Sequence, residues 1–158
     1  MFGEFHGLPV HALVVHSVVV FAPLSALIAI AFLVPKWRRV LRWPLLVASA
    51  IAAGSAYVAM ESGKKLKDNI RDQLQGNPTG KIVDEHEQLG QRLFWVLLVF
   101  FVVAVIAVAL SSMDRALVAH LGAVVVAVVA IAVGVLTYQT GEKGSEAVWN
   151  PTGTIDYG

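Results

Sequence analysis

Three histidines lie in or beside apolar stretches of the chain, where ionisable side chains are unusual. His11 and His16 belong to VHALVVHSVVV (residues 10–20), and His86 belongs to DEHEQLG (residues 84–90). A neutral imidazole nitrogen is a common ligand of haem iron, zinc and copper. Because ionisable residues in apolar membrane segments are functional candidates by default, these three are the candidate ligands of a haem or a metal ion.

The spacing of His11 and His16 excludes one kind of site. Five residues turn a helix by about 140°, so the two side chains do not share a face. They are therefore not a chelating pair of the type that two histidines four residues apart can form. A bound cofactor needs ligands from different helices, and the best pair combines His11 or His16 with His86.

Three uses of such a pair remain open, because none of the spacings is diagnostic. Two imidazoles that face each other across a helix bundle would hold a b-type haem. His11, His86 and a carboxylate would instead form a zinc or copper site. The candidate carboxylates are Glu61 and Glu87, with Asp84 and Glu85 as neighbours. In the third interpretation the histidines bind only backbone groups or acids and lock one end of the bundle.

The segments that carry these residues are strongly apolar. Of the 158 residues, 57% are hydrophobic and 15% are charged, against roughly 25% charged in soluble domains, and the mean hydropathy is +0.71. Four stretches, about residues 10–34, 44–60, 93–110 and 116–138, are long enough to cross a bilayer as helices. The sequence predicts an all-α fold, in which residues 1–158 form a single integral membrane domain with a bundle of four transmembrane helices.

The remaining segments also carry structural signals. In the extramembrane loop 61–92, Leu66, Ile70 and Leu74 have helical spacing, which predicts an amphipathic helix, either an extension of the second span or a helix on the membrane surface. GNPTG interrupts this pattern, and Thr79 is the expected cap of the next helix. Residues 150–158 are expected to form a flexible tail. MESGKK and YQTGEK end the second and fourth spans, which suggests two duplicated helical hairpins.

Basic residues predict the orientation of the bundle. The loop PKWRRVLRWP between the first two spans carries four basic residues and no acid, and SSMDRA between the last two adds Arg115. Since cytoplasmic loops are enriched in lysine and arginine, we expect both loops inside and both termini outside. A net charge of +1 gives no case for a nucleic-acid partner, and the absence of cysteine excludes disulfides and thiolate metal sites.

Position along the bundle decides which histidines can meet. Counted at about 1.5 Å per residue from the cytoplasmic helix ends, His11 and His86 each lie roughly 36 Å up, and His16 lies roughly 29 Å up. The hydrocarbon core is about 30 Å thick, so His11 and His86 share a level just beyond its outer boundary. His120 lies near the cytoplasmic end, cannot reach them, and is expected to be a packing histidine.

Three short motifs resemble a family of small bacterial four-helix membrane proteins catalogued as a domain of unknown function. The motifs are HALVVH at the first span, DEHEQLG before the third and TGEKGSEAVW after the fourth, and the resemblance covers the chain from about His11 to Trp149. Some relatives are fused to a Rieske-type iron–sulfur domain, which implies a setting of respiratory electron transfer. The histidines of the family correspond to His11, His16 and His86.

These observations favour an accessory or structural subunit, associated with membrane electron transfer, in the bacterial plasma membrane. The alternative is a haem b protein with bis-histidine ligation at the outer side, and a weaker one is a transporter or a zinc- or copper-binding membrane protein. An enzyme is not expected, because no nucleophile–base pair, phosphate loop or dinucleotide motif is present. The expected partners are the lipid bilayer and either a larger respiratory complex or a second copy of the chain, without nucleic acid.

Overall fold

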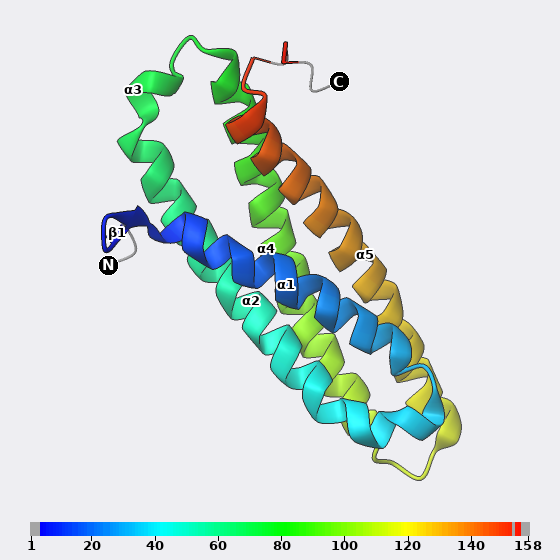
Figure 1. Cartoon of the computed structure of the whole chain (residues 1–158). Helices are drawn as coiled ribbons and strands as arrows, with labels where there is room; N and C mark the ends of the chain where they lie inside the picture. Colours follow the sequence, from blue (N-terminus) through cyan, green and yellow to red (C-terminus); the bar gives the residue numbers. More distant parts are fainter. Residues whose placement is uncertain (1–3, 153, 156–158) are drawn as a thin grey trace.

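The computed structural model describes residues 4–152 and 154–155, and four long helices dominate it (Figure 1). Their bounds are α1 Val10–Ala31, α2 Arg38–Asn69, α4 Pro78–Leu110 and α5 Ala116–Trp149. The short elements are an antiparallel pair of two-residue strands, β1 (Glu4–Phe5) and β2 (Leu8–Pro9), the 3-10 turn η1 (Pro35–Trp37) and the single turn α3 (Arg71–Leu74). Each long helix has the length and hydropathy needed to cross a membrane. The predicted all-α bundle of four transmembrane helices is confirmed, whereas the small strand pair before α1 was not predicted.

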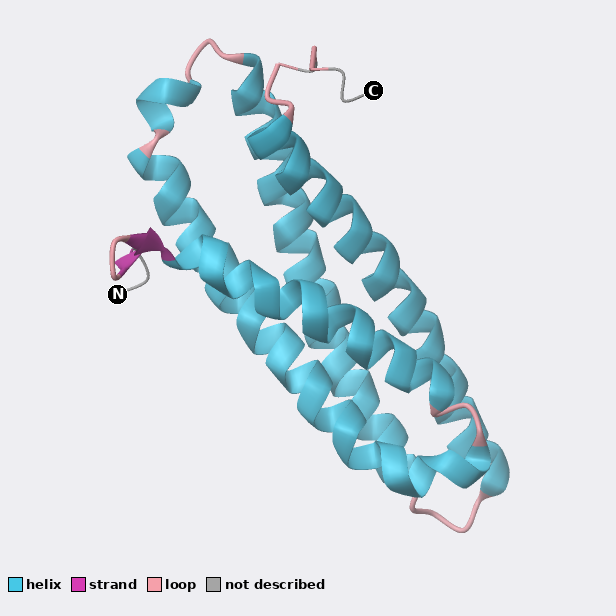
Figure 2. Cartoon of the chain, viewed as in Figure 1, coloured by secondary structure: helices cyan, strands magenta, loops and turns pink. Residues whose placement is uncertain are grey.

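The four long helices occupy the corners of the bundle. α1 packs against α2 and α5, and α4 packs against the same two helices, so α1 and α4 lie at diagonally opposite corners. The loops α1–α2 and α4–α5 lie at one end of the bundle, and the turn between α3 and α4 lies at the other (Figure 2). Side chains of α1 and α4 can therefore meet only across the bundle axis.

Small side chains fill the centre of this bundle. Alanines from all four helices are fully buried, among them Ala22, Ala52, Ala104 and Ala123. Small residues let helix backbones approach closely, which is how helices associate where lipid removes the hydrophobic drive between them. A few large apolar side chains, Phe32, Leu45, Leu97 and Phe100, are buried beside them, while many others point outward, and Leu117 is 71% exposed. Since soluble monomers rarely expose continuous apolar surface of this kind, the outer face of the bundle suits a lipid bilayer.

The segment predicted as an extramembrane loop, residues 61–92, is almost entirely helical. α2 continues to Asn69, α4 begins at Pro78, and only α3 and short turns lie between them. Of the amphipathic pattern, Leu66 lies in the extension of α2, Ile70 lies between α2 and α3, and Leu74 lies in α3. The apolar stretches 44–60 and 93–110 lie within α2 and α4, and the polar ends of both helices extend beyond them.

Asn77, and not Thr79, caps α4. The side-chain oxygen of Asn77 accepts hydrogen bonds from the backbone N–H of Thr79 at 3.2 Å and from its hydroxyl at 3.0 Å. Pro78 occupies the first helical position, where a missing N–H costs nothing. The expectation for Thr79 was wrong because the helix starts at Pro78, two residues earlier than a cap at Thr79 implies, which makes Asn77 the capping acceptor.

The predicted tail is described only in part, since residues 153 and 156–158 lie outside the described residues. Within the described part, the backbone N–H of Ile155 donates to the Asn150 side chain at 3.1 Å. The Thr79 hydroxyl also donates to the Pro151 carbonyl at 3.3 Å, which ties the end of α5 to the start of α4. The flexibility of residues 150–158 stays a prediction.

Arg38 joins α1, α2 and α5 at the end of the bundle that carries the two short loops. Its guanidinium donates to the carbonyls of Phe32 at 3.0 Å and Leu33 at 3.1 Å, at the C-terminal end of α1. Its Nη2 atom also lies 3.1 Å from Nδ1 of His120 on α5. The structure thus places His120 at the opposite end from the other membrane histidines, in a packing contact as expected.

Replacing Arg38 with glutamine is expected to destabilise the protein by about 1–3 kcal/mol, because the two carbonyls at the end of α1 lose a buried charged donor. Thermal melting of the detergent-solubilised protein, followed by circular dichroism, measures the change. Lys36→Gln is the matched control, since Lys36 is an exposed cation of the same turn. A shift for Arg38→Gln no larger than that of the control would contradict this role.

Candidate functional site

His11 and His86 meet across the bundle axis. His11 lies in the first turn of α1 and His86 in the third turn of α4, both half-buried. Their ring centroids are 6.0 Å apart, and the ring planes are inclined at 86°. The count of residues along the helices therefore predicted the correct level, and the diagonal arrangement of α1 and α4 brings the two rings together.

Both rings are anchored in the same way. Nδ1 of His11 lies 2.8 Å from the Ala59 carbonyl of α2, and Nδ1 of His86 lies 2.9 Å from the Thr140 carbonyl of α5. Because a carbonyl can only accept, each Nδ1 carries a proton, and Nε2 is the ring nitrogen whose lone pair could bind a metal. A hydrogen bond from the other ring nitrogen is what orients a metal-bound histidine in proteins.

Glycines make room for the two rings. Gly63 follows Ala59 by one helical turn, and a Cβ atom at this position would lie 3.0 Å from Nδ1 of His11. Gly144 follows Thr140 by one turn, and its Cβ atom would lie 2.9 Å from Cε1 of His86. A larger residue at either position would push the ring away from its carbonyl. Sequence reasoning missed both glycines as site residues.

The two helical hairpins, α1–α2 and α4–α5, repeat this arrangement. In each hairpin a carbonyl holds the histidine ring, and the glycine four residues later touches it. The motif match between MESGKK and YQTGEK aligns Gly63 with Gly141, but the contacts with the histidines pair Gly63 with Gly144. A Cβ atom at Gly141 would meet nothing within 4 Å, whereas one at Gly144 would meet the His86 ring. When the second hairpin is shifted by three residues in this alignment, Gly63 aligns with Gly144.

His16 does not join this pair. Its ring is exposed, and its Nδ1 lies 2.7 Å from the carbonyl of Ala12, four residues earlier on the same helix. The turn of about 140° between His11 and His16 therefore directs only His11 toward His86. The sequence left open whether His11 or His16 meets His86. In the structure it is His11 that lies beside His86.

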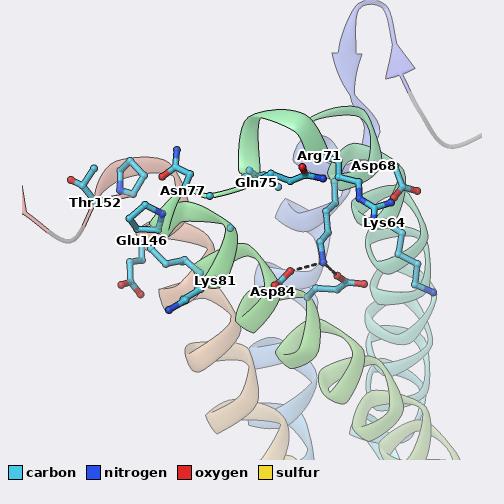
Figure 3. A pocket seen from close by; sticks show the side chains of 17 residues that line it. Lys64, Asp68, Arg71, Gln75, Asn77, Lys81, Asp84, Glu146 and Thr152 are labelled. Carbon is cyan, nitrogen blue, oxygen red and sulfur yellow. Dashed lines mark hydrogen bonds and ion pairs between the residues drawn. The ribbon is translucent and has the colours of Figure 1, made fainter.

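The acids on either side of His86 are bound to lysines of both neighbouring helices. Lys67 of α2 lies 2.7 Å from Asp84 and 2.5 Å from Glu87, and Figure 3 shows both ion pairs as dashed lines. Lys143 of α5 lies 2.9 Å from Glu85. The turn of α4 that carries His86 is therefore held from two sides, which fixes the direction of its ring.

The two acids expected in a mixed metal site are both paired with lysines. Glu61 lies 2.7 Å from Lys64, and Glu87 is bound by Lys67. Across the described ranges, no group of three or more histidine, aspartate or glutamate side chains is arranged to hold a metal ion. The zinc or copper set of His11, His86 and a carboxylate stays a prediction.

A cleft of about 1200 Å³ opens beyond the histidine pair, between the α2–α3 segment and the first turns of α4 (Figure 3). Its lining mixes cations such as Lys64, Arg71 and Lys81 with acids such as Asp68 and Glu146. With both signs of charge present, this cleft does not select a ligand of one charge.

The pKa shifts in this polar end follow from the contacts. Burial lowers the pKa of His86, which lies before the membrane-spanning stretch 93–110; the Thr140 carbonyl opposes this shift, and His11 adds to it. The His86 ring is therefore neutral near physiological pH, as a metal ligand requires. Hydrogen bonds to Asp84 and Glu87 raise the pKa of Lys67.

Replacing Lys67 with glutamine is expected to lower stability by less than about 1 kcal/mol, because the ion pairs are partly exposed. A raised pKa in the folded state gives stability that is fully present below the unfolded value of about 10.4 and is lost as the pH rises through the folded value. Thermal melts measure this. The melting temperatures of wild type and Lys67→Gln should differ at neutral pH, and this difference should become smaller at strongly alkaline pH. With Lys81→Gln as control, a difference that persists at alkaline pH would contradict the ion-pair account.

Comparison with known proteins identifies the family of the chain, and the description of that family names no activity. A family model described as "Predicted membrane protein (DUF2231)" matches residues 7–156. No curated protein and no solved structure matches the chain.

Proposed function

We propose that this chain, which belongs to the DUF2231 family of predicted membrane proteins, binds one b-type haem between His11 and His86. The observation that carries the proposal is the pair of anchored rings whose centroids lie 6.0 Å apart. A metal held between two imidazoles lies about 2 Å from each nitrogen, so the centres of two such rings are roughly 6 Å apart. The separation in this bundle suits one iron atom with two axial ligands.

The number of protein ligands favours haem over a bare metal ion. A zinc site uses three or four protein ligands, and only the two imidazoles converge here among the described residues. In a haem the porphyrin supplies four nitrogen ligands to the iron, so the protein needs to supply only the remaining one or two. His11 and His86 are enough for that purpose.

The residues of α2 and α5 next to the ring pair are small. A haem held by α1 and α4 must extend toward the other diagonal pair, α2 and α5. Next to the rings these two helices present small residues, with Ala59 and Gly63 on α2 and Thr140 and Gly144 on α5. These four residues therefore hold the imidazole rings in place. None of them has a large side chain.

The proposed function is electron transfer at one face of the membrane. When bound, the haem supplies one-electron redox chemistry, and ligand identity and burial set its potential. The chain supplies two oriented imidazoles, and the ion pairs of Lys67 and Lys143 hold the turn that carries His86. With the orientation expected from the basic loops, the site faces the outer side of a bacterial plasma membrane. It would there exchange electrons with a larger respiratory complex.

A second candidate is a cofactor-free accessory subunit, and one observation favours it. Each Nδ1 already has a backbone partner, and the edge contact between the rings joins the two hairpins without any ligand. In that case the histidines stabilise the polar end of a bundle that packs against a larger membrane complex.

Absorbance spectra separate the two candidates. The full chain is produced with a saturating supply of haem, purified in a mild detergent, and measured in the oxidised and dithionite-reduced states. We expect a Soret band with b-type reduced bands and a stoichiometry of a single haem per chain. A preparation without a Soret band would overturn haem binding and leave the accessory role.

A further inference from the structure

A second pocket lies at the opposite end of the bundle from the histidine pair. It has a volume of about 560 Å³ and lies between the start of α2 and the loop that joins α4 to α5. Three arginines of the first helical turns of α2, namely Arg38, Arg39 and Arg42, line one side. Asp114 is the acid on the other side, so the pocket has an excess of positive charge.

The three arginines have different roles in this pocket. Arg38 is fully engaged with α1 and His120, as described above. Arg39 is exposed, so its side chain can turn toward a ligand. Arg42 has a buried Nε atom that makes no hydrogen bond with any described part of the chain, while its guanidinium carbon lies 6.0 Å from the Trp43 ring.

The buried Nε atom of Arg42 is the observation that points to a ligand. A buried donor without a partner costs free energy, and more so when it carries charge, so such donors in native proteins generally have an acceptor. The acceptor that best matches two neighbouring guanidinium groups is a phosphate, whose oxygens accept paired hydrogen bonds from arginine.

The position of the pocket identifies the source of that phosphate. Trp37 and Trp43 are the sequence neighbours of Arg38 and Arg42 and are 48% and 64% exposed, as tryptophans are at the boundary between lipid and water. Val40 of α2 and Leu117 of α5, the two helices that contribute to the pocket, are 72% and 71% exposed. A phosphate group bound here would lie at the level of the lipid headgroups.

We propose that this pocket binds the phosphate of an anionic phospholipid headgroup. Arg39 and Arg42 bind the phosphate oxygens, and Arg38 is a positioning residue that holds the start of α2 against α1 and α5. Basic pockets between transmembrane helices recognise anionic headgroups in this way, because charge attraction adds to hydrogen bonding. The bound lipid would connect the two loops at this end of the bundle. The proposal is independent of the haem site.

The test compares lipid binding by the full chain and its variants in detergent. Wild type is mixed with phosphatidylglycerol or with phosphatidylcholine, and native mass spectrometry counts the lipids that stay bound. We expect phosphatidylglycerol to be retained in preference to phosphatidylcholine. Since each basic group contributes about a fivefold factor near anionic lipid, Arg39→Gln combined with Arg42→Gln should weaken phosphatidylglycerol binding roughly 25-fold, and Arg42→Gln alone about fivefold.

The matched control removes two basic side chains from the other end, with Arg71→Gln and Lys81→Gln, and should bind phosphatidylglycerol as wild type does. Equal retention of the two lipids by wild type would overturn the proposal, as would unchanged phosphatidylglycerol binding by the Arg42→Gln variant. A separate arm uses inorganic phosphate alone. If inorganic phosphate binds at Arg42 and phosphatidylglycerol does not, the headgroup assignment is wrong.

Discussion

Replacing either His11 or His86 with alanine is expected to abolish stoichiometric haem binding, whereas His16→Ala leaves it unchanged. In the proposed site each of the first two histidines would supply one ligand to the iron, so neither could be lost without leaving the haem with a single protein ligand. Loss of a supporting residue around a metal costs roughly 10- to 100-fold in affinity, and loss of a ligand costs more. His16 is exposed and bound to its own helix, so its removal changes neither ligand.

The measurement is a titration of each purified apoprotein with haem, followed at the Soret band, with circular dichroism as the check on folding. The alanine variants should remain folded, because each loses one hydrogen bond to a carbonyl, worth about 1 kcal/mol. The ligand assignment would be wrong if His11→Ala combined with His86→Ala still bound haem as tightly as wild type. It would also be wrong if His16→Ala were the variant that lost it.

The second large effect is expected from Gly144→Ala. The added Cβ atom would lie 2.9 Å from Cε1 and 3.3 Å from Nδ1 of His86. The ring cannot keep both its bond to the Thr140 carbonyl and its place on the bundle axis. We expect haem affinity to fall roughly 10- to 100-fold, as for other residues that orient a metal ligand, although alanine favours the helix by up to about 1 kcal/mol.

Gly134→Ala is the matched control for this variant. Gly134 lies on the same helix, and a Cβ atom there meets nothing within 4 Å. Thermal melting and haem titration of both variants separate a loss of fold from a loss of ring position. Equal haem affinity in Gly144→Ala and Gly134→Ala would show that the close contact with His86 has no part in binding.

The helices and the level of the histidines could be predicted because both depend on distances along the chain alone. Long apolar segments must be helical in lipid, and a fixed rise per residue gives His11 and His86 the same height. The choice between His11 and His16 could not be made in the same way. It depends on how α1 is rotated about its own axis, and a helix that is apolar on all sides carries no pattern that sets this rotation.

The roles of the charged residues near His86 also depend on tertiary structure. From the sequence alone, Glu87 and Asp84 are reasonable metal ligands, because nothing along the chain shows which cations lie beside them. Because α2 continues as a helix to Asn69, Lys67 is carried alongside α4 and binds both acids. The two glycines could not be found from the sequence repeat. The best sequence match aligns Gly63 with Gly141, whereas the contacts with the histidines show that Gly144 is its counterpart.

Electron paramagnetic resonance of the oxidised, haem-loaded protein tests the central claim most directly. Ferric haem with two imidazole ligands is low-spin, whereas haem with a single protein ligand is high-spin. The account predicts a low-spin signal from wild type, strongly anisotropic because the planes of His11 and His86 are nearly perpendicular, and a high-spin signal or none from His86→Ala. A high-spin signal from wild type, or a low-spin signal that survives in His86→Ala, would contradict the claim that these two residues hold the iron.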